Sequence, residues 1–134
     1  MSTNLEIIDR ALFELGYQSS EETASTADGA AALVELNNMM AEWRVSDLDL
    51  NWFKQDTLGD TIPIPDWAER GIISNLAVGL SAVFTVPVKA ELAVKADNGK
   101  NLISRTLFNL NLTQADMTTM PQGRDQGRSI LTDQ

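Results

Sequence analysis

The candidate catalytic groups in this sequence are carboxylates. The chain has no histidine and no cysteine, so it lacks an imidazole to move protons near pH 7 and a thiolate to bind zinc or act as a nucleophile. Four aspartates gather in one short stretch, at Asp47, Asp49, Asp56 and Asp60. Such a cluster is compatible with a carboxylate pair that hydrolyses a sugar linkage, or with oxygen ligands for calcium.

The spacing of these aspartates argues against both kinds of chemistry. A calcium loop needs oxygen ligands at alternate positions, a glycine at the turn and a closing glutamate. Here Trp52, Phe53 and Lys54 stand where ligands are required. The chain also lacks the glycine-rich phosphate loops and the Gly-x-Ser-x-Gly nucleophile motif. We therefore expect no enzyme activity, no cofactor and no metal, and we interpret the stretch as a solvated acidic loop.

Four segments around this loop predict helices, so the expected fold class is all-α, with a four-helix bundle-like core. Thr3 and Glu6 have the spacing of a capping box at the start of the first helix, and Gly16 is a suitable end. The second helix is expected over about 26–45, with apolar residues at helical spacing on one face. Trp43 shares that apolar phase and is expected in the core.

The third and fourth helices are expected on either side of Pro87. The third begins after Asp66 as its N-cap, and its stretch IISNLAVGLSAVF is apolar on most sides, which is typical of the buried centre of a bundle. A membrane span is the competing interpretation, but the apolar run is short, contains polar residues and meets the proline. The fourth helix covers about 88–110, where Gly99 is expected to kink or briefly break it.

The composition changes after Leu112 to a polar segment rich in glycine and glutamine. Such a segment cannot bury enough apolar surface to fold alone. We therefore divide the chain into a helical core, 1–112, and an extended C-terminal arm, 113–134. Two interpretations of the arm remain open, a disordered tail and an arm that folds on a partner. Its candidate anchors are Met117, Met120, Pro121, Gly123, Arg124, Arg128 and Ile130.

Charge is distributed unevenly along the chain. Residues 1–66 carry thirteen acidic side chains against three basic ones, whereas residues 67–134 carry six against seven. An acidic surface repels phosphate, so a protein that grips duplex DNA is not expected. The asymmetry has two interpretations: a solvated acidic face that keeps the protein soluble, or a head-to-tail contact between identical subunits.

The order of these motifs resembles a known family. A first helix ending LFELG precedes a second ending LNNMMAEW; Pro-Asp then leads into a helix containing NLAVGLS, followed by another helix and a tail with MPQG. The most specific pieces are MMAEW, at Met39–Trp43, and MPQG, at Met120–Gly123. This arrangement resembles the head-to-tail adaptors of short-tailed bacteriophages, also called tail accessory or packaged-DNA-stabilisation proteins, over nearly the whole chain.

The resemblance implies a structural connector at the head–tail junction of a virion, assembled in the host cytoplasm. It implies a homo-oligomeric ring, typically of twelve copies, below the portal protein, which the C-terminal arms would grip. The ring would extend the DNA channel, retain packaged DNA and hold tail components such as a nozzle or tail hub. DNA would pass without sequence-specific binding, and no membrane is involved.

Within this picture the acidic loop faces a neighbouring subunit or the channel. The candidate residues are Asp47, Asp49, Trp52 and Phe53. For the two aromatic residues, burial in the core and exposure at an interface remain equally open, because aromatic side chains serve both purposes.

Two other functions compete with the connector. An acidic helical regulator or DNA mimic that binds a basic host protein would share the acidity without needing the arm. A hydrolase of cell-wall sugars would use Asp47 and Asp49, and it ranks last because the catalytic signals are weak.

Overall fold

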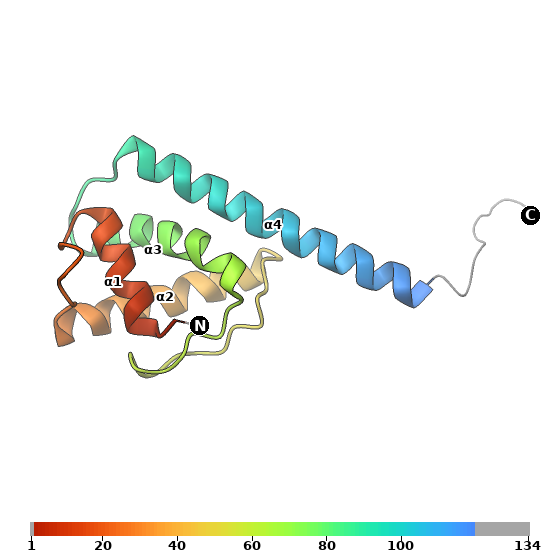
Figure 1. Ribbon diagram of the computed structural model, residues 1–134, viewed down its shortest axis with the longest axis horizontal. Coiled ribbons are helices and arrows are strands. Elements are labelled where there is room, and N and C mark those ends of the chain that lie inside the picture. Colours follow the sequence, from red (N-terminus) through yellow and green to blue (C-terminus); the bar gives the residue numbers. More distant parts are fainter. Residues whose placement is uncertain (1, 120–134) are drawn as a thin grey trace, which may run out of the picture. The chain divides into compact units, whose positions relative to one another are not determined.

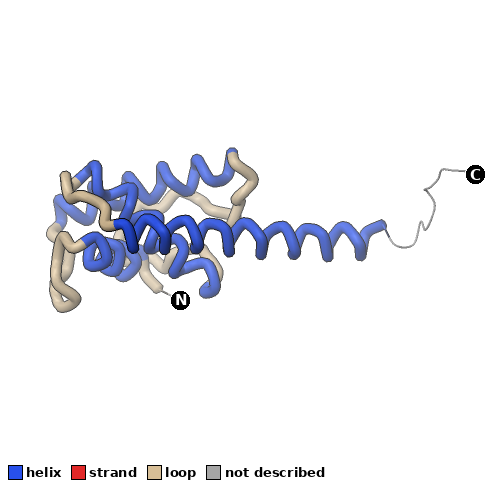
Figure 2. Tube along the Cα trace, turned by 90° about the horizontal axis from the view of Figure 1, so that it is seen from above, coloured by secondary structure: helices blue, strands red, loops and turns tan. Residues whose placement is uncertain are grey.

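The structure is a computed structural model that describes the backbone of residues 2–119 and the side chains of residues 2–112 (Figure 1). The expected all-α fold class is confirmed for this part of the chain, in which every segment is helix or loop (Figure 2). The helices are α1 (Asn4–Leu15), α2 (Thr26–Val45), the 3₁₀ helix η1 (Asp66–Ala68), α3 (Glu69–Val83) and α4 (Ala90–Thr119).

The chain divides into two compact units, Met1–Ile103 and Ser104–Gln134, with the boundary inside α4. The unit that ends at Ile103 is called the body below. The part of the second unit with described side chains, residues 104–112, is called the distal segment of α4.

The caps of α1 are those expected from the sequence. The Thr3 hydroxyl accepts a hydrogen bond from the Glu6 N–H at 3.2 Å, and the Glu6 carboxylate accepts one from the Thr3 N–H at 2.8 Å. Gly16 ends the helix in the left-handed region at φ 89°, where a side chain would be strained. The bounds of α2 are also those expected, and Ser25 caps its first turn through the Asp28 N–H.

The start of the third helix differs from the expectation. Asp66 does not cap it; this residue opens η1, and Pro65 occupies the cap position without a side-chain cap bond. Proline at position 65 fixes an extended φ, so the chain turns into η1 before the α-helical hydrogen bonds begin. The helix proper therefore starts at Glu69.

The core of the body forms around α3, which contacts both α1 and α2. Its residues Ile72, Leu76 and Leu80 are fully buried, as expected for the central helix. Trp43 of α2 is also buried, and the Lys100 ammonium lies 5.7 Å from the centre of its ring. The fully buried large side chains are Ile7, Ile8, Leu12, Leu15, Leu36, Met40, Ile62, Ile64, Ile72, Leu76, Leu80 and Ile103.

Two glycines set the contact between α3 and the first part of α4. A Cβ atom added to Gly99 would lie 2.7 Å from the Cα of Gly71, so the two backbones touch. The Asn75 amide donates to the carbonyl of Gly71 at 2.8 Å and to that of Ala96 at 2.9 Å, which ties the helices together. The expected break at Gly99 is wrong: α4 continues through this residue. The glycine instead allows the close approach to Gly71.

α4 ends at Thr119, not near Leu110. Residues 113–119, expected at the start of the extended arm and including Met117, are therefore helical in backbone. The stretch from Lys100 to Met120 contains no glycine or proline, so nothing ends the helix before the approach to Pro121. The other predicted arm anchors, Met120, Pro121, Gly123, Arg124, Arg128 and Ile130, lie outside the described residues. No helix in residues 2–119 is long and apolar enough to cross a membrane.

Candidate interaction surfaces

The loop that follows α2 alternates buried and exposed side chains. Leu48, Leu50 and Trp52 are buried, whereas Asp47, Asp49 and Asn51, which alternate with them, are exposed. The left-handed backbone at Asp47, φ 67°, turns the chain immediately after the helix. The acid–leucine alternation thus lays this loop on the body with its leucines inward.

A polar network holds this loop between α1 and α2. The Asn37 side-chain oxygen accepts hydrogen bonds from the Trp52 indole N–H at 3.2 Å and from the Gln55 N–H at 2.9 Å. The Asn37 amide donates to the Gln55 carbonyl at 2.9 Å. The buried Gln55 side chain accepts from the Asn4 amide at 2.9 Å and donates to the Phe53 carbonyl at 2.9 Å. Because each loop group in this network has a partner, the loop can stay buried without strand pairing.

Sequence reasoning missed the residues of this network. Asn37 and Gln55 carry no motif spacing, and they are far apart along the chain. The available signal was the Asn-Asn pair inside the otherwise apolar helix end LNNMM, since an asparagine facing the core needs hydrogen-bond partners.

The structure separates the two loop aromatics. Trp52 is buried, with 7% of its surface exposed, so its placement at an exposed interface is wrong and the core alternative holds. Its indole N–H requires the partner that Asn37 supplies. Phe53 is 65% exposed, as befits the interface alternative. Asp47 and Asp49, in the same loop, are also exposed.

Phe53 borders a groove of about 410 Å³ between α2 and the loop. The charged residues that line it are Arg44 and Lys54, although the body as a whole is acidic. Arg44 lies 3.6 Å from the Asp49 carboxylate, a contact between exposed side chains that adds little stability. The full lining is Asn37, Asn38, Met40, Ala41, Arg44, Trp52, Phe53 and Lys54.

The carboxylates of the loop do not gather into a metal centre. In the part of the chain that the structure describes, no group of three acidic side chains lies close enough together to hold a metal ion. Asp49 instead accepts a hydrogen bond from the Asn51 N–H at 2.8 Å, which fixes the turn.

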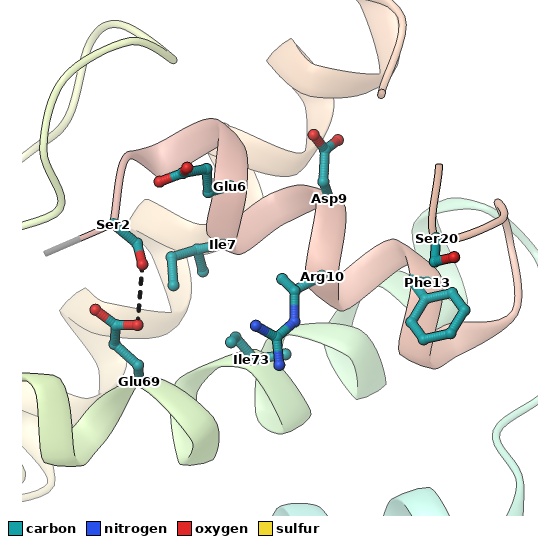
Figure 3. Close-up of a pocket in the computed structure, with 9 residues that line it drawn as sticks. All are labelled: Ser2, Glu6, Ile7, Asp9, Arg10, Phe13, Ser20, Glu69 and Ile73. Atoms are coloured by element: carbon teal, nitrogen blue, oxygen red, sulfur yellow. Dashed lines mark hydrogen bonds between the residues drawn. The ribbon is translucent and has the colours of Figure 1, made fainter. Parts of the chain in front are cut away.

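A second cleft, of about 400 Å³, lies between α1 and α3 (Figure 3). We call it the α1–α3 cleft. Glu69 stands at one end, where its carboxylate accepts a hydrogen bond from the Ser2 hydroxyl at 3.0 Å. Phe13 stands at the other end, and the Arg10 side chain lies between them beside Ile73 (Figure 3). The full lining is Ser2, Glu6, Ile7, Asp9, Arg10, Phe13, Ser20, Glu69 and Ile73.

The charges of this cleft are mostly negative. Glu6, Asp9 and Glu69 line it against the single cation Arg10. The Asp9 carboxylate is already held by the Ala24 N–H at 2.9 Å and the Gln18 amide at 3.3 Å. Within the described residues, the side chain of Arg10 makes no hydrogen bond or ion pair.

Beyond the cleft, aromatic side chains continue along the surface of the body. The rings of Tyr17 and Phe84 lie 4.5 Å apart, and the Tyr17 hydroxyl donates to Asp28 at 3.0 Å. That hydrogen bond to a carboxylate raises the pKa of the Tyr17 phenol.

The distal segment of α4 exposes large apolar side chains. Phe108, Leu110 and Leu112 have 65%, 54% and 50% of their surfaces exposed within nine residues. Soluble helices normally turn such residues toward a core. Leu110 lies seven residues after the buried Ile103 and therefore on the same side of the helix. Phe108 and Leu112 lie on another side.

Burial of one carboxylate gives a pH-dependent prediction. The pKa of Glu35 is raised above its ordinary value of 4.5, mainly because the carboxylate is partly removed from solvent and to a smaller extent because Glu42 repels its charge. The folded state therefore holds this proton more tightly than the unfolded chain, and stability falls as pH rises through the raised pKa. We expect Glu35→Gln to stabilise the body at pH 7 by a few tenths of a kcal/mol, because the side chain is only partly buried.

Urea unfolding at pH 7 and below pH 4 measures this effect. The stabilisation should vanish at the lower pH, where Glu35 is protonated in both the folded and unfolded states. An equal gain at both pH values would mean that the carboxylate charge is not its cause.

Comparison with known proteins does not add to these observations. No protein-family model matches the chain, and no curated protein matches it.

Proposed function

We propose that this protein is a structural connector of a tailed bacteriophage, a ring subunit between the portal and the tail. The observation that carries the proposal is the distal segment of α4, which presents Phe108, Leu110 and Leu112 to solvent within five residues of one helix. Two of them, Phe108 and Leu112, have the i, i+4 spacing of the anchors by which a helix packs into a groove on another molecule.

The apolar residues of the distal segment are costly to leave in water. Burying a leucine or phenylalanine side chain is worth about 1.5–3 kcal/mol. A helix whose apolar residues find no cover within the described chain is suited to assembly. The resemblance of MMAEW and MPQG to head-to-tail adaptors supplies the identity of that assembly, in which the C-terminal region grips the portal.

The charge of the body fits a channel protein. Residues 1–103 carry sixteen acidic side chains against seven basic ones. Acidic walls repel phosphate over a distance of about 8–10 Å at physiological salt, so DNA could pass without being held. The same acidity favours the alternative function, an acidic regulator or DNA mimic that binds a basic host protein.

Light scattering coupled to size-exclusion chromatography separates these functions. The protein would be measured alone, mixed with the portal protein encoded by the same phage, and mixed with a basic nucleic-acid-binding protein. A connector forms a complex of many copies with portal and does not bind the basic protein. Stable complexes with the basic protein and none with portal would favour the regulator.

Removing residues 120–134 gives a further prediction. The buried residues and hydrogen bonds of the body lie in residues 2–103, so the truncated chain should keep its helical circular dichroism and its unfolding free energy to within about 0.5 kcal/mol. We expect portal binding to be abolished, because the predicted anchors from Met120 to Ile130 are lost. Portal binding at full strength by the truncated chain would contradict the proposed role of the arm.

A further inference from the structure

The distal segment of α4 and the α1–α3 cleft have complementary chemistry. On the segment, Arg105, Phe108 and Leu112 are spaced i, i+3 and i+7, which places them on one side of the helix. All three side chains are exposed, and Arg105 makes no ion pair within the described residues. It is the segment's only charged residue, so the segment has a net charge of +1.

The cleft presents the opposite charge beside an exposed aromatic ring. Its three carboxylates and one guanidinium give a net charge of −2. Phe13 is 48% exposed and supplies apolar surface, whereas Ile7 and Ile73 are buried beneath the cleft. At Glu69, the Ser2 hydroxyl occupies one carboxylate oxygen at 3.0 Å. The other oxygen has no hydrogen-bond partner among the described residues, so it can accept one from an arginine.

The two surfaces also match in length. From Arg105 to Leu112 the helix rises over seven residues, which is about 10.5 Å at 1.5 Å per residue. The cleft runs along α1 from Glu6 to Phe13, again seven residues and about 10.5 Å. With the incoming helix parallel to α1, its arginine meets the Glu6–Glu69 end while Leu112 meets Phe13.

We propose that the α1–α3 cleft of one copy of this chain binds the distal segment of α4 from a second copy. Arg105 pairs with Glu69, and Phe108 and Leu112 lie along the cleft toward the exposed Phe13 ring. Two acidic bodies repel each other. The distal segment, whose single charge is positive, can therefore contact the body of another copy at a lower electrostatic cost than the other body can. The inference deepens the proposed function, on whose homo-oligomeric ring it rests.

Charge reversal and its rescue test the pairing in the full-length protein. Glu69→Lys and Arg105→Glu should each weaken self-association about tenfold in sedimentation equilibrium, because each places like charges together. Mixing the two single variants should restore association to within about threefold, since the acidic segment of one variant then meets the basic cleft of the other. Asp97→Lys, the same change of charge at an exposed site on α4, is the matched control and should have little effect.

Disulfide trapping gives a second readout, made clean by the absence of native cysteine. Chains with Phe13→Cys, mixed with chains with Leu112→Cys, should form a cross-linked heterodimer on oxidation. Phe13→Cys mixed with Val94→Cys, another exposed position on α4, should not. Circular dichroism verifies that each variant is folded.

The outcomes separate this inference from the connector function. Rescue by the mixed charges together with selective cross-linking supports the cleft as the docking site. The proposal is overturned if the substitutions at Glu69 and Arg105 leave self-association unchanged. It is also overturned if neither self-association nor a cross-link is found at the highest soluble concentration. The connector function is measured by portal binding instead, so failure of the cleft and failure of the connector function give different results.

Discussion

Gly99→Ala should lower the free energy of unfolding by about 1–3 kcal/mol, although alanine favours a helix. The added methyl group would lie 2.7 Å from the Cα of Gly71, which is a backbone atom that cannot rotate away. The helices must separate, and this strains the hydrogen bond that the Asn75 amide of α3 donates to the Ala96 carbonyl of α4. Urea unfolding monitored by circular dichroism gives the value.

A second glycine on α3 provides the matched control. A Cβ on Gly79 would meet the Glu35 carboxylate at 2.7 Å, which is the end of a flexible side chain that can move. Gly79→Ala should therefore be neutral or stabilising by up to about 1 kcal/mol, the usual gain for alanine in a helix. If both substitutions stabilised the protein equally, the close approach of α3 and α4 at Gly71 and Gly99 would be refuted.

Asn37→Ala should cost about 2–3 kcal/mol of unfolding free energy. Its side chain satisfies the Trp52 indole N–H, the Gln55 N–H and the Gln55 carbonyl, and each buried group left without a partner costs about 1–3 kcal/mol. Part of this cost is relieved because water can reach the half-buried site. The Trp52 indole N–H resonance in the NMR spectrum should shift as its hydrogen bond is lost.

Two substitutions show whether the network, and not the helix, is responsible. Asn37→Asp keeps the acceptor for both N–H groups but sets a carboxylate oxygen against the Gln55 carbonyl, so the loss should be smaller but should not vanish, about 1–2 kcal/mol. Asn38→Ala changes the neighbouring exposed asparagine and should stay within about 0.5 kcal/mol of the parent. A loss at Asn38 as large as at Asn37 would point to helix propensity instead.

Local signals in the sequence were sufficient for the helices. The Thr3–Glu6 capping box and Gly16 predicted the ends of α1, and the apolar period predicted α2 over its observed bounds. These features depend on hydrogen bonds and side chains within a few residues, which the order of residues determines directly. The same local reasoning failed at the C-terminal end of α4, where polar composition suggested an arm although no residue before Pro121 stops a helix.

The candidate surfaces depended on contacts between distant residues. Trp52 and Phe53 are adjacent and similar in type, so no local rule could assign one to the core and the other to solvent. Trp52 can be buried because Asn37, fifteen residues earlier in the chain, accepts a hydrogen bond from its indole N–H. Likewise the α1–α3 cleft joins Glu69 to Glu6 and Phe13 only after the helices pack.

The sequence by itself therefore determined that this protein is helical, acidic in its first half, and built without histidine or cysteine chemistry. Only the tertiary structure decided which loop residues are buried, that Gly99 serves close packing and not a break, and that Arg10, Glu69 and Phe13 share one cleft. The reason is physical: helix formation is set by neighbours along the chain, whereas burial and clefts are set by neighbours in space.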